Sequence, residues 1–271
     1  MRADGARTRR RGEAHTRGRV IGLAGNLSRD VFPERPTRPG GGPFHGARAL
    51  RRLQVRSVVL ARCTPADRAE LFDPLVRLGV TARFVPASET TSFELRYDGE
   101  RRQMRVLATG EPWAALDLPP AVRWLQLAPL LRGDFPLELL ATLARRRRIA
   151  FDGQGLVRVR RAGPLELDAD FDPELLRHLS VLKLSDQEAE VLGDPAALPV
   201  REVVVTHGSR GVSVYAAGRV ERVAASPIEG DPTGAGDAFV AAYVASRAAG
   251  LDPFAAARRA VPVVAAVLAD Q

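Results

Sequence analysis

Short apolar segments alternate with amphipathic segments along most of this chain, and this alternation restricts the fold more than any other feature. Runs typical of strands occupy residues 19–25, 56–63, 123–129, 148–153, 181–185 and 202–208. Helical patterns lie between several of them, at residues 42–53, 64–79 and 136–148. The alternation predicts an α/β fold in which helices cover a mostly parallel sheet. Because the apolar runs are continuous, we expect these strands to be buried on both faces.

Residues 91–107 interrupt this alternation. They form two strand-like segments that turn at Asp98-Gly99, which is a strong hairpin signal. Phe93, Leu95 and Tyr97 alternate with polar residues, so one face of the hairpin is expected to be covered and the other solvated. The segment, approximately residues 88–108, is therefore either a lid over a site or an edge of the sheet.

The composition is that of a globular protein. The chain has 271 residues, 45% of them hydrophobic, enough for one large domain or two small ones. No apolar run reaches the roughly 18 residues that span a bilayer, and the N-terminus lacks the apolar centre of a secretory signal. The single cysteine, Cys63, cannot form an internal disulfide. These features predict a cytoplasmic protein without a membrane partner.

The formal net charge of +8 is concentrated at the N-terminus. The first 19 residues contain seven arginines against Asp4 and Glu13, a net charge of +5. Since this segment has few apolar residues, residues 1–18 are predicted to be a disordered basic tail. The remainder carries about +3, and no basic segment is interleaved with aromatic residues. The charge therefore argues against nucleic acid as the main partner.

Residues 228–245 place three glycines, a threonine and two aspartates immediately before an apolar helical pattern. Gly234, Ala235 and Gly236 fall where that helix begins, and the unpaired N–H groups of a first helical turn form an anion site. Asp237 follows directly. A carboxylate beside an anion is useful when it accepts the proton of a hydroxyl group that attacks a phosphate. The alternative is an ordinary helix start, in which an aspartate is favoured by the helix dipole alone.

The nine residues "DPTGAGDAF" at 231–239 resemble the C-terminal signature of the PfkB (ribokinase-like) family of small-molecule kinases, D-T-x-G-A-G-D-x-F. One position differs, where Pro232 replaces the usual threonine. The resemblance implies a three-layer α/β/α kinase domain over residues 19–271, with ATP and Mg²⁺ as cofactors. It also implies that Asp237 is the catalytic base and that the backbone of Gly234, Ala235 and Gly236 is the anion hole. Asp231 and Thr233 would lie near the phosphates, the metal and a K⁺ site.

Segments near the N-terminus resemble the acceptor-binding motifs of this family. Asp30, in "GNLSRD", would hold substrate hydroxyl groups, and Gly41 and Gly42, in "PGGGPFHGARAL", would line the sugar pocket. His45 either binds substrate or caps the pocket helix. The asparagine common in that helix of the family is absent, which weakens any specific assignment to ribose.

Three further segments follow in the family's order. "FDGQGLVR" at 151–158 is similar to its D-x-N-x-x-R motif and implies that Asp152, Gln154 and Arg158 lie near the transferred phosphate, with Gln154 among the substrate-binding residues. "THGSRG" at 206–211 resembles its nucleotide turn. The residues that would bind the nucleotide are Thr206, Gly208, Gly211, Lys183 and Thr233.

"KLSDQEAEVLG" at 183–193 has two interpretations. The family has N-x-x-E here, with the glutamate holding Mg²⁺ through water, which would make Glu188 a metal residue together with Asp231. Ser185 followed by Glu188 is also an ordinary helix capping box. The position of the segment between the two neighbouring motifs favours the metal role for Glu188.

Three functions are compatible with this sequence. The first is a sugar or polyol kinase, with an inositol-like substrate suggested by the D-x-Q-G-x-x-R form, acting as a monomer or homodimer. The second is a nucleoside kinase, for which Phe44, Phe93 and Tyr97 are candidates to clamp the base. The third is a non-catalytic sugar-sensing or nucleic-acid-binding protein, against which the intact Asp237 argues. The C-terminus looks short for the family, so the adenine pocket is the least defined part.

Overall fold

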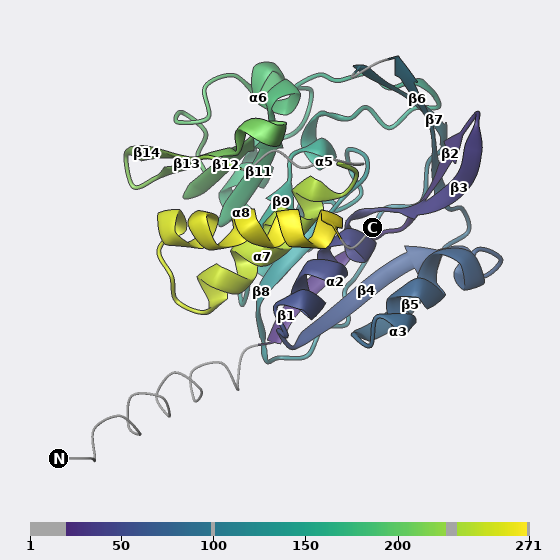
Figure 1. Ribbon diagram of the computed structural model, residues 1–271, viewed down its shortest axis with the longest axis horizontal. Coiled ribbons are helices and arrows are strands. Elements are labelled where there is room, and N and C mark those ends of the chain that lie inside the picture. Colours follow the sequence, from purple (N-terminus) through teal and green to yellow (C-terminus); the bar gives the residue numbers. More distant parts are fainter. Residues whose placement is uncertain (1–19, 99–100, 226–231, 270–271) are drawn as a thin grey trace.

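The computed structural model describes residues 20–98, 101–225 and 232–269 (Figure 1). The predicted tail at residues 1–18 and Asp231 lie outside the described residues. A nine-stranded sheet in the order β14-β13-β12-β11-β9-β8-β1-β4-β5 forms the body. Its strands are β1 (Val20–Asn26), β4 (Ser57–Cys63), β5 (Thr81–Pro86), β8 (Val122–Ala128), β9 (Arg148–Asp152), β11 (Val181–Ser185), β12 (Glu202–Thr206), β13 (Val212–Ala216) and β14 (Arg219–Val223). The pairs from β5 to β12 are parallel, whereas β13 and β14 are antiparallel.

Helices cover both faces of this sheet, which confirms the three-layer prediction. One face packs against α2 (Gly42–Arg52), the turn η1 (Arg68–Phe72), α3 (Asp73–Arg77), α7 (Ala235–Ala248) and α8 (Pro253–Ala269). The other packs against α4 (Leu137–Ala144), η2 (Pro173–His178) and α6 (Asp186–Leu192). Two short helices, α5 (Gln154–Val157) and η3 (Gly208–Arg210), follow β9 and β12.

The helix expected at residues 64–79 is shorter than predicted and begins at Arg68. Its first turn is π-helical, with the N–H of Asp73 bonded to the carbonyl oxygen of Arg68. Pro74 then occupies the start of α3, where its missing N–H costs no hydrogen bond. The proline therefore divides the expected helix into two short segments.

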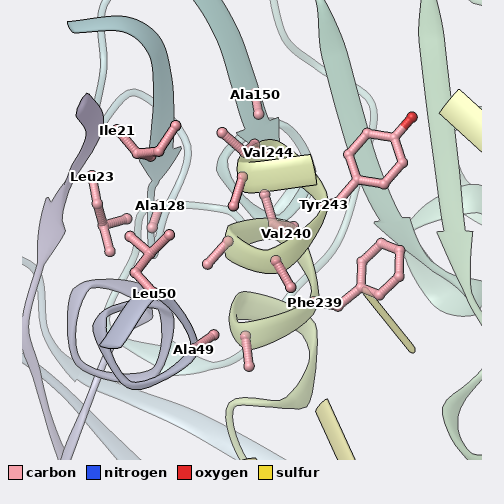
Figure 2. Close-up of a cluster of buried hydrophobic side chains, with 14 of the residues drawn as sticks. Ile21, Leu23, Ala49, Leu50, Ala128, Ala150, Phe239, Val240, Tyr243 and Val244 are labelled. Atoms are coloured by element: carbon pink, nitrogen blue, oxygen red, sulfur yellow. The ribbon is translucent and has the colours of Figure 1, made fainter. Parts of the chain in front are cut away.

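The helix α7 lies at the centre of the core (Figure 2). Phe239, Val240, Tyr243 and Val244 are all buried, and α7 packs beside α2 and against the strands. Alanines at 238, 241, 242 and 245 let the neighbouring backbones approach closely. This packing fixes the N-terminal end of α7, where the predicted anion hole begins.

A second sheet, in the order β10-β7-β6-β2-β3, stands beside the body (Figure 1). Its strands are β2 (Ser28–Phe32), β3 (Arg35–Gly40), β6 (Thr91–Asp98), β7 (Arg101–Ala108) and β10 (Gly163–Pro164). The predicted hairpin is confirmed as β6 and β7, paired through Asp98 and Arg101. Phe93 is buried and Arg96 is exposed, as the alternation predicted. We call this five-stranded unit the lid sheet; it is larger than the hairpin lid expected from the sequence.

Among the residues that the structure describes, every helix is too short or too polar to cross a lipid bilayer. Cys63 is buried at the end of β4.

Candidate active site

The N-terminal end of α7 is built on a left-handed glycine. Gly234 is the N-cap of the helix with φ of 82°, a conformation that favours glycine. A Cβ atom at this position would also overlap the ring of His45, which is buried on α2. A Cβ atom at Gly236 would lie 3.0 Å from Nζ of Lys183. The turn is therefore closely bounded by His45 and Lys183. Within it, the N–H of Ala235 donates to the carbonyl oxygen of Pro232 over 3.0 Å.

Asp237 lies in the first turn of α7, directly after Gly236. Its Oδ1 atom is buried and has no hydrogen-bond partner among the described residues. Burial, with the negative charge of Asp152, raises the pKa of Asp237 to about 7, although Lys183 and Arg158 oppose this shift. A carboxylate with this pKa can accept a proton near neutral pH.

Lys183 lies between the carboxylates of three different elements. Its Nζ atom is 3.1 Å from Oδ2 of Asp152 and 4.0 Å from Oε2 of Glu188. Burial alone would lower the pKa of Lys183, but Asp152, Glu188 and Asp237 outweigh this effect and raise it. Lys183 therefore remains a cation beside the predicted anion hole. Burial also raises the pKa of Asp152, against the opposing charge of Lys183.

Glu188 forms the capping box that its sequence context suggested, and its metal role stays a prediction. The capping box of α6 is complete, with the N–H of Ser185 donating to Oε2 of Glu188 over 2.8 Å and the Glu188 N–H donating to Oγ of Ser185 over 3.3 Å. The same carboxylate also faces Lys183. The cap thus fixes a carboxylate at the edge of the site rather than removing it from the site.

A cavity of about 870 Å³ brings together most of the residues predicted for catalysis and nucleotide binding. Its lining includes Gln154, Arg158, Lys183, Glu188, Thr206, Gly208, Gly211, Thr233, Gly234, Ala235, Gly236 and Asp237. One end is apolar and includes residues from β13, β14 and α8 that the sequence did not single out: Val212, Val223, Val261, Pro262, Val264 and Leu268. In the sequence, the apolar residues of α8 have the pattern of core positions. Only the fold shows that they line a cavity.

Of the residues predicted for substrate binding, Gln154 lines this cavity, whereas Asp30, Gly41, Gly42 and His45 are not in its lining. The run Gly40 to Gly42 connects them to the catalytic end: a Cβ atom at Gly40 would lie 2.5 Å from Oδ2 of Asp30, and one at Gly42 would lie 2.5 Å from Oδ1 of Asp237. Gly41 is the N-cap of α2. Oγ of Ser28 donates to Oδ1 of Asp30 over 2.9 Å. The glycine run therefore lies between the carboxylates of Asp30 and Asp237.

Gln154 is held by the body of the protein. Its Nε2 donates to the carbonyl oxygen of Pro129 over 2.6 Å, and its backbone N–H donates to Oδ1 of Asp152 over 3.2 Å. Gln126, which the sequence did not indicate, donates from Nε2 to the carbonyl oxygen of Asp237 over 3.3 Å. These bonds fix the backbone on both sides of the site.

Comparison with known proteins places this arrangement in a family. The family model described as pfkB family carbohydrate kinase matches residues 33–270. The chain belongs to the pfkB family of carbohydrate kinases. Its fold is ribokinase-like, since it superposes with a TM-score of 0.80 on a pyrophosphate-dependent kinase of the ribokinase family whose structure holds a pyrophosphate analogue and myo-inositol. That kinase is 25% identical, and the match covers 92% of this chain and 95% of the other.

Two further proteins resemble this chain, one in sequence and one in fold alone. An inositol 3-kinase of Oryza sativa subsp. japonica is 32% identical over 182 residues, which cover 61% of this chain and 46% of the rice protein. The chain spans about half the length of the curated relatives it matches. A ribokinase of Arabidopsis thaliana, solved with ribose and ATP, shares the fold at a TM-score of 0.66 and 17% identity, covering 92% of this chain and 91% of that one.

Proposed function

We propose that this protein transfers the terminal phosphoryl group of ATP to a hydroxyl group of a polyol of the inositol class. The observation that carries the proposal is the buried, unpartnered Oδ1 of Asp237 beside the N-terminal N–H groups of α7. A general base and an anion hole adjoin each other there, as transfer of a phosphoryl group to an alcohol requires.

The proposed reaction begins at the acceptor hydroxyl group, which loses its proton to Asp237 while its oxygen forms a bond to the γ-phosphorus. The bond between that phosphorus and the bridging oxygen breaks, and ADP leaves with the electron pair. N–H groups in the first turn of α7 and the cations Lys183 and Arg158 stabilise the charge on the transferred group. The N–H of Ala235 is bonded to the carbonyl oxygen of Pro232 in this structure, so it must exchange that partner to take part.

The carboxylates of Asp152 and Glu188 fit a Mg²⁺ ion that also binds the phosphates, because Mg²⁺ is commonly held by one or two carboxylates plus substrate oxygens. When bound, Mg²⁺ would neutralise charge on the phosphates. Asp231 was predicted to act with Glu188 and to shape a K⁺ site with Thr233. Since Asp231 lies outside the described residues, both roles stay predictions from the family resemblance.

The apolar end of the cavity favours ATP over pyrophosphate as the phosphoryl donor. Val212, Val261 and Leu268 offer apolar surface to a nucleobase, whereas pyrophosphate would leave that surface unused. Both donors need to be compared, because the kinase described above has the same fold and depends on pyrophosphate.

The acceptor region favours a polyol over a nucleoside. Phe93 is 2% exposed and belongs to the core of the lid sheet, and Phe44 packs its ring 5.4 Å from the ring of His45. Phe93 is therefore enclosed in its own cluster, and Phe44 packs against His45 and the core of the body, which argues against a clamp for a nucleobase. The side chain of Tyr97, the third candidate, is outside the description. Asp30 and the glycine run instead offer a carboxylate and backbone groups, which suit hydroxyl groups.

A donor and acceptor matrix tests the proposal. The protein is incubated with Mg²⁺, with either ATP or pyrophosphate, and with myo-inositol, ribose or inosine, and phosphomonoesters are followed by ³¹P NMR. We expect a product with ATP and myo-inositol, and none from the matched Asp237→Asn variant. Product from inosine alone would establish the nucleoside kinase alternative, and product from pyrophosphate alone would overturn the choice of donor.

A further inference from the structure

Residues 157–168 form a hairpin-like segment that leaves the active site directly. The N–H of Asp168 donates to the carbonyl oxygen of Val157 over 3.1 Å, and the N–H of Val159 donates to that of Glu166 over 3.0 Å. Arg158 and Leu167 pair between these bonds as an antiparallel bridge. We call residues 157–168 the connecting hairpin. Its first strand contains Arg158, one of the two cations that line the cavity near Asp237.

The far end of the connecting hairpin belongs to the lid sheet. Gly163 and Pro164 are the strand β10, which pairs antiparallel with β7. The N–H of Leu165 donates to the carbonyl oxygen of Met104 over 2.9 Å. The Leu165 side chain is half-buried and packs against an apolar cluster that joins Phe93 and Val106 of the lid sheet to Leu130 and Leu131, which follow β8. Any displacement of β7 must therefore move this end of the hairpin or break these contacts.

The near end of the connecting hairpin is attached to the body. The carbonyl oxygen of Arg158 accepts from the N–H of Arg132 over 2.9 Å, and Nε of Arg132 donates to the carbonyl oxygen of Leu156 over 2.7 Å. Midway, Arg160 forms an ion pair with the buried Asp134 and donates to the carbonyl oxygen of Gly110, just beyond β7. The hairpin thus spans the body and the lid sheet with polar contacts at both ends.

Leu165 and Leu167 also line the same cavity as Arg158. One segment therefore contributes to the lid cluster, to the cavity wall and to the cations near the anion hole. An acceptor that binds between the lid sheet and Asp237 would contact the connecting hairpin, which contains Arg158 as well as these two leucines.

We propose that the connecting hairpin positions Arg158 in response to the placement of the lid sheet, with Leu165 as the residue that joins the two. This inference rests on the proposed function and extends it. Acceptor binding fixes the position of the lid sheet, and the lid sheet in turn fixes the position of β10. The position of β10 then determines where the guanidinium group of Arg158 meets the donor phosphate. Donor and acceptor should therefore bind cooperatively, and each should raise the affinity of the other by the same factor.

Calorimetry on the full chain tests this coupling. The Kd of the β,γ-imido analogue of ATP is measured with Mg²⁺, with and without saturating myo-inositol. The ratio of the two values should be about fivefold or more in the parent protein. In Leu165→Ala the ratio should fall to near one, and Leu165→Met, which restores apolar volume, should recover it. Leu175→Ala is the matched control, because Leu175 is a half-buried leucine in the core cluster of the body beneath α4, η2 and α6. It should keep the parent ratio.

The outcomes separate the two proposals. A parent protein that phosphorylates myo-inositol but shows no coupling, or a Leu165→Ala variant that keeps the parent ratio, overturns the role of the hairpin and leaves the proposed function standing. Equal loss of coupling in Leu175→Ala would show that Leu165 acts only through general packing, and would also overturn it. A parent protein that binds neither ligand and forms no product overturns the proposed function.

Discussion

The proposed donor side and the proposed acceptor side of the candidate site are built in different ways. The donor side uses ends of strands in one sheet and the first turn of α7, and its residues lie in short contiguous motifs. The acceptor side joins two sheets: Asp30 comes from β2 in the lid sheet, whereas Gly42 begins α2 against the body. A phosphate is bound largely by backbone N–H groups, but a polyol is distinguished by side chains and by the placement of the lid. We therefore expect the donor side to tolerate fewer chemical alternatives and the acceptor side to set the substrate.

Asp237 is the one side chain that both sides share, and its replacement should have the largest effect. Asp237→Asn keeps the size of the residue and removes the base, so kcat should fall by roughly 10² to 10⁴. Donor affinity should be unchanged or tighter, because a negative charge beside the phosphates is removed. Single-turnover rates and calorimetry with the imido analogue measure the two quantities. If the variant phosphorylates at the parent rate, residues 234–237 have no catalytic role and only form the start of a helix.

Two glycine substitutions compare the sides directly. A Cβ atom at Gly42 would overlap the Cβ atom of Ala128 and press on Asp237, whereas one at Gly236 meets only the flexible end of Lys183. We expect Gly42→Ala to lower kcat/KM by roughly 10- to 100-fold and to cost about 1–3 kcal/mol of stability. Gly236→Ala should change kcat/KM only a few-fold, mainly through the donor KM. Steady-state kinetics with each substrate varied in turn would show the split, and equal losses in both variants would contradict it.

The pH dependence should report the charges on the donor side. Because Asp237 must be ionised to accept a proton and its pKa is raised to about 7, kcat/KM should fall about tenfold per pH unit below this value and level off above it. In Lys183→Met the break should move to higher pH, since Lys183 favours the ionised form of Asp237. A profile that is flat from pH 5 to 8 in the parent protein would remove Asp237 as the titrating base.

The fold could largely be predicted from local patterns, because each buried strand of the parallel sheet carries its own continuous apolar run. The strands β1, β4, β8, β9, β11 and β12 appear at the expected residues within a position or two. The segments β2 and β3 were missed, since residues 28–40 contain three prolines, one glycine and three arginines. They become strands by pairing with each other and with β6, which no local pattern encodes.

The donor residues could be predicted for a similar reason. Gly234 starts a helix, Thr206 ends β12 and Lys183 lies two residues before the end of β11. The ends of neighbouring strands meet at one edge of a sheet. Leu165, Leu167 and the apolar wall from α8 could not be found in this way. Their side chains are ordinary core types, and only the pairing of β10 with β7 and the docking of α8 bring them to the cavity.

The smallest predicted effect concerns stability and has opposite signs at two aspartates. The pKa of Asp237 is higher in the folded protein than the roughly 3.9 of an unfolded chain, so ionising it costs stability as the pH rises from about 4 to about 7. Asp237→Asn avoids this cost and should raise Tm by roughly 2–8 °C at pH 8, with a smaller gain at pH 5. At the exposed Asp168, hydrogen bonds from the Asp170 N–H and Arg132 lower the pKa, so its ionised form stabilises the fold. Asp168→Asn should therefore lower Tm slightly at pH 8, and the difference should begin to shrink near pH 4 and be lost as the pH falls through the lowered pKa of Asp168. Thermal unfolding of both variants across this range measures the two trends. A loss of stability in Asp237→Asn at pH 8 would mean that this carboxylate is held by favourable contacts, contrary to the strained base that the buried Oδ1 implies.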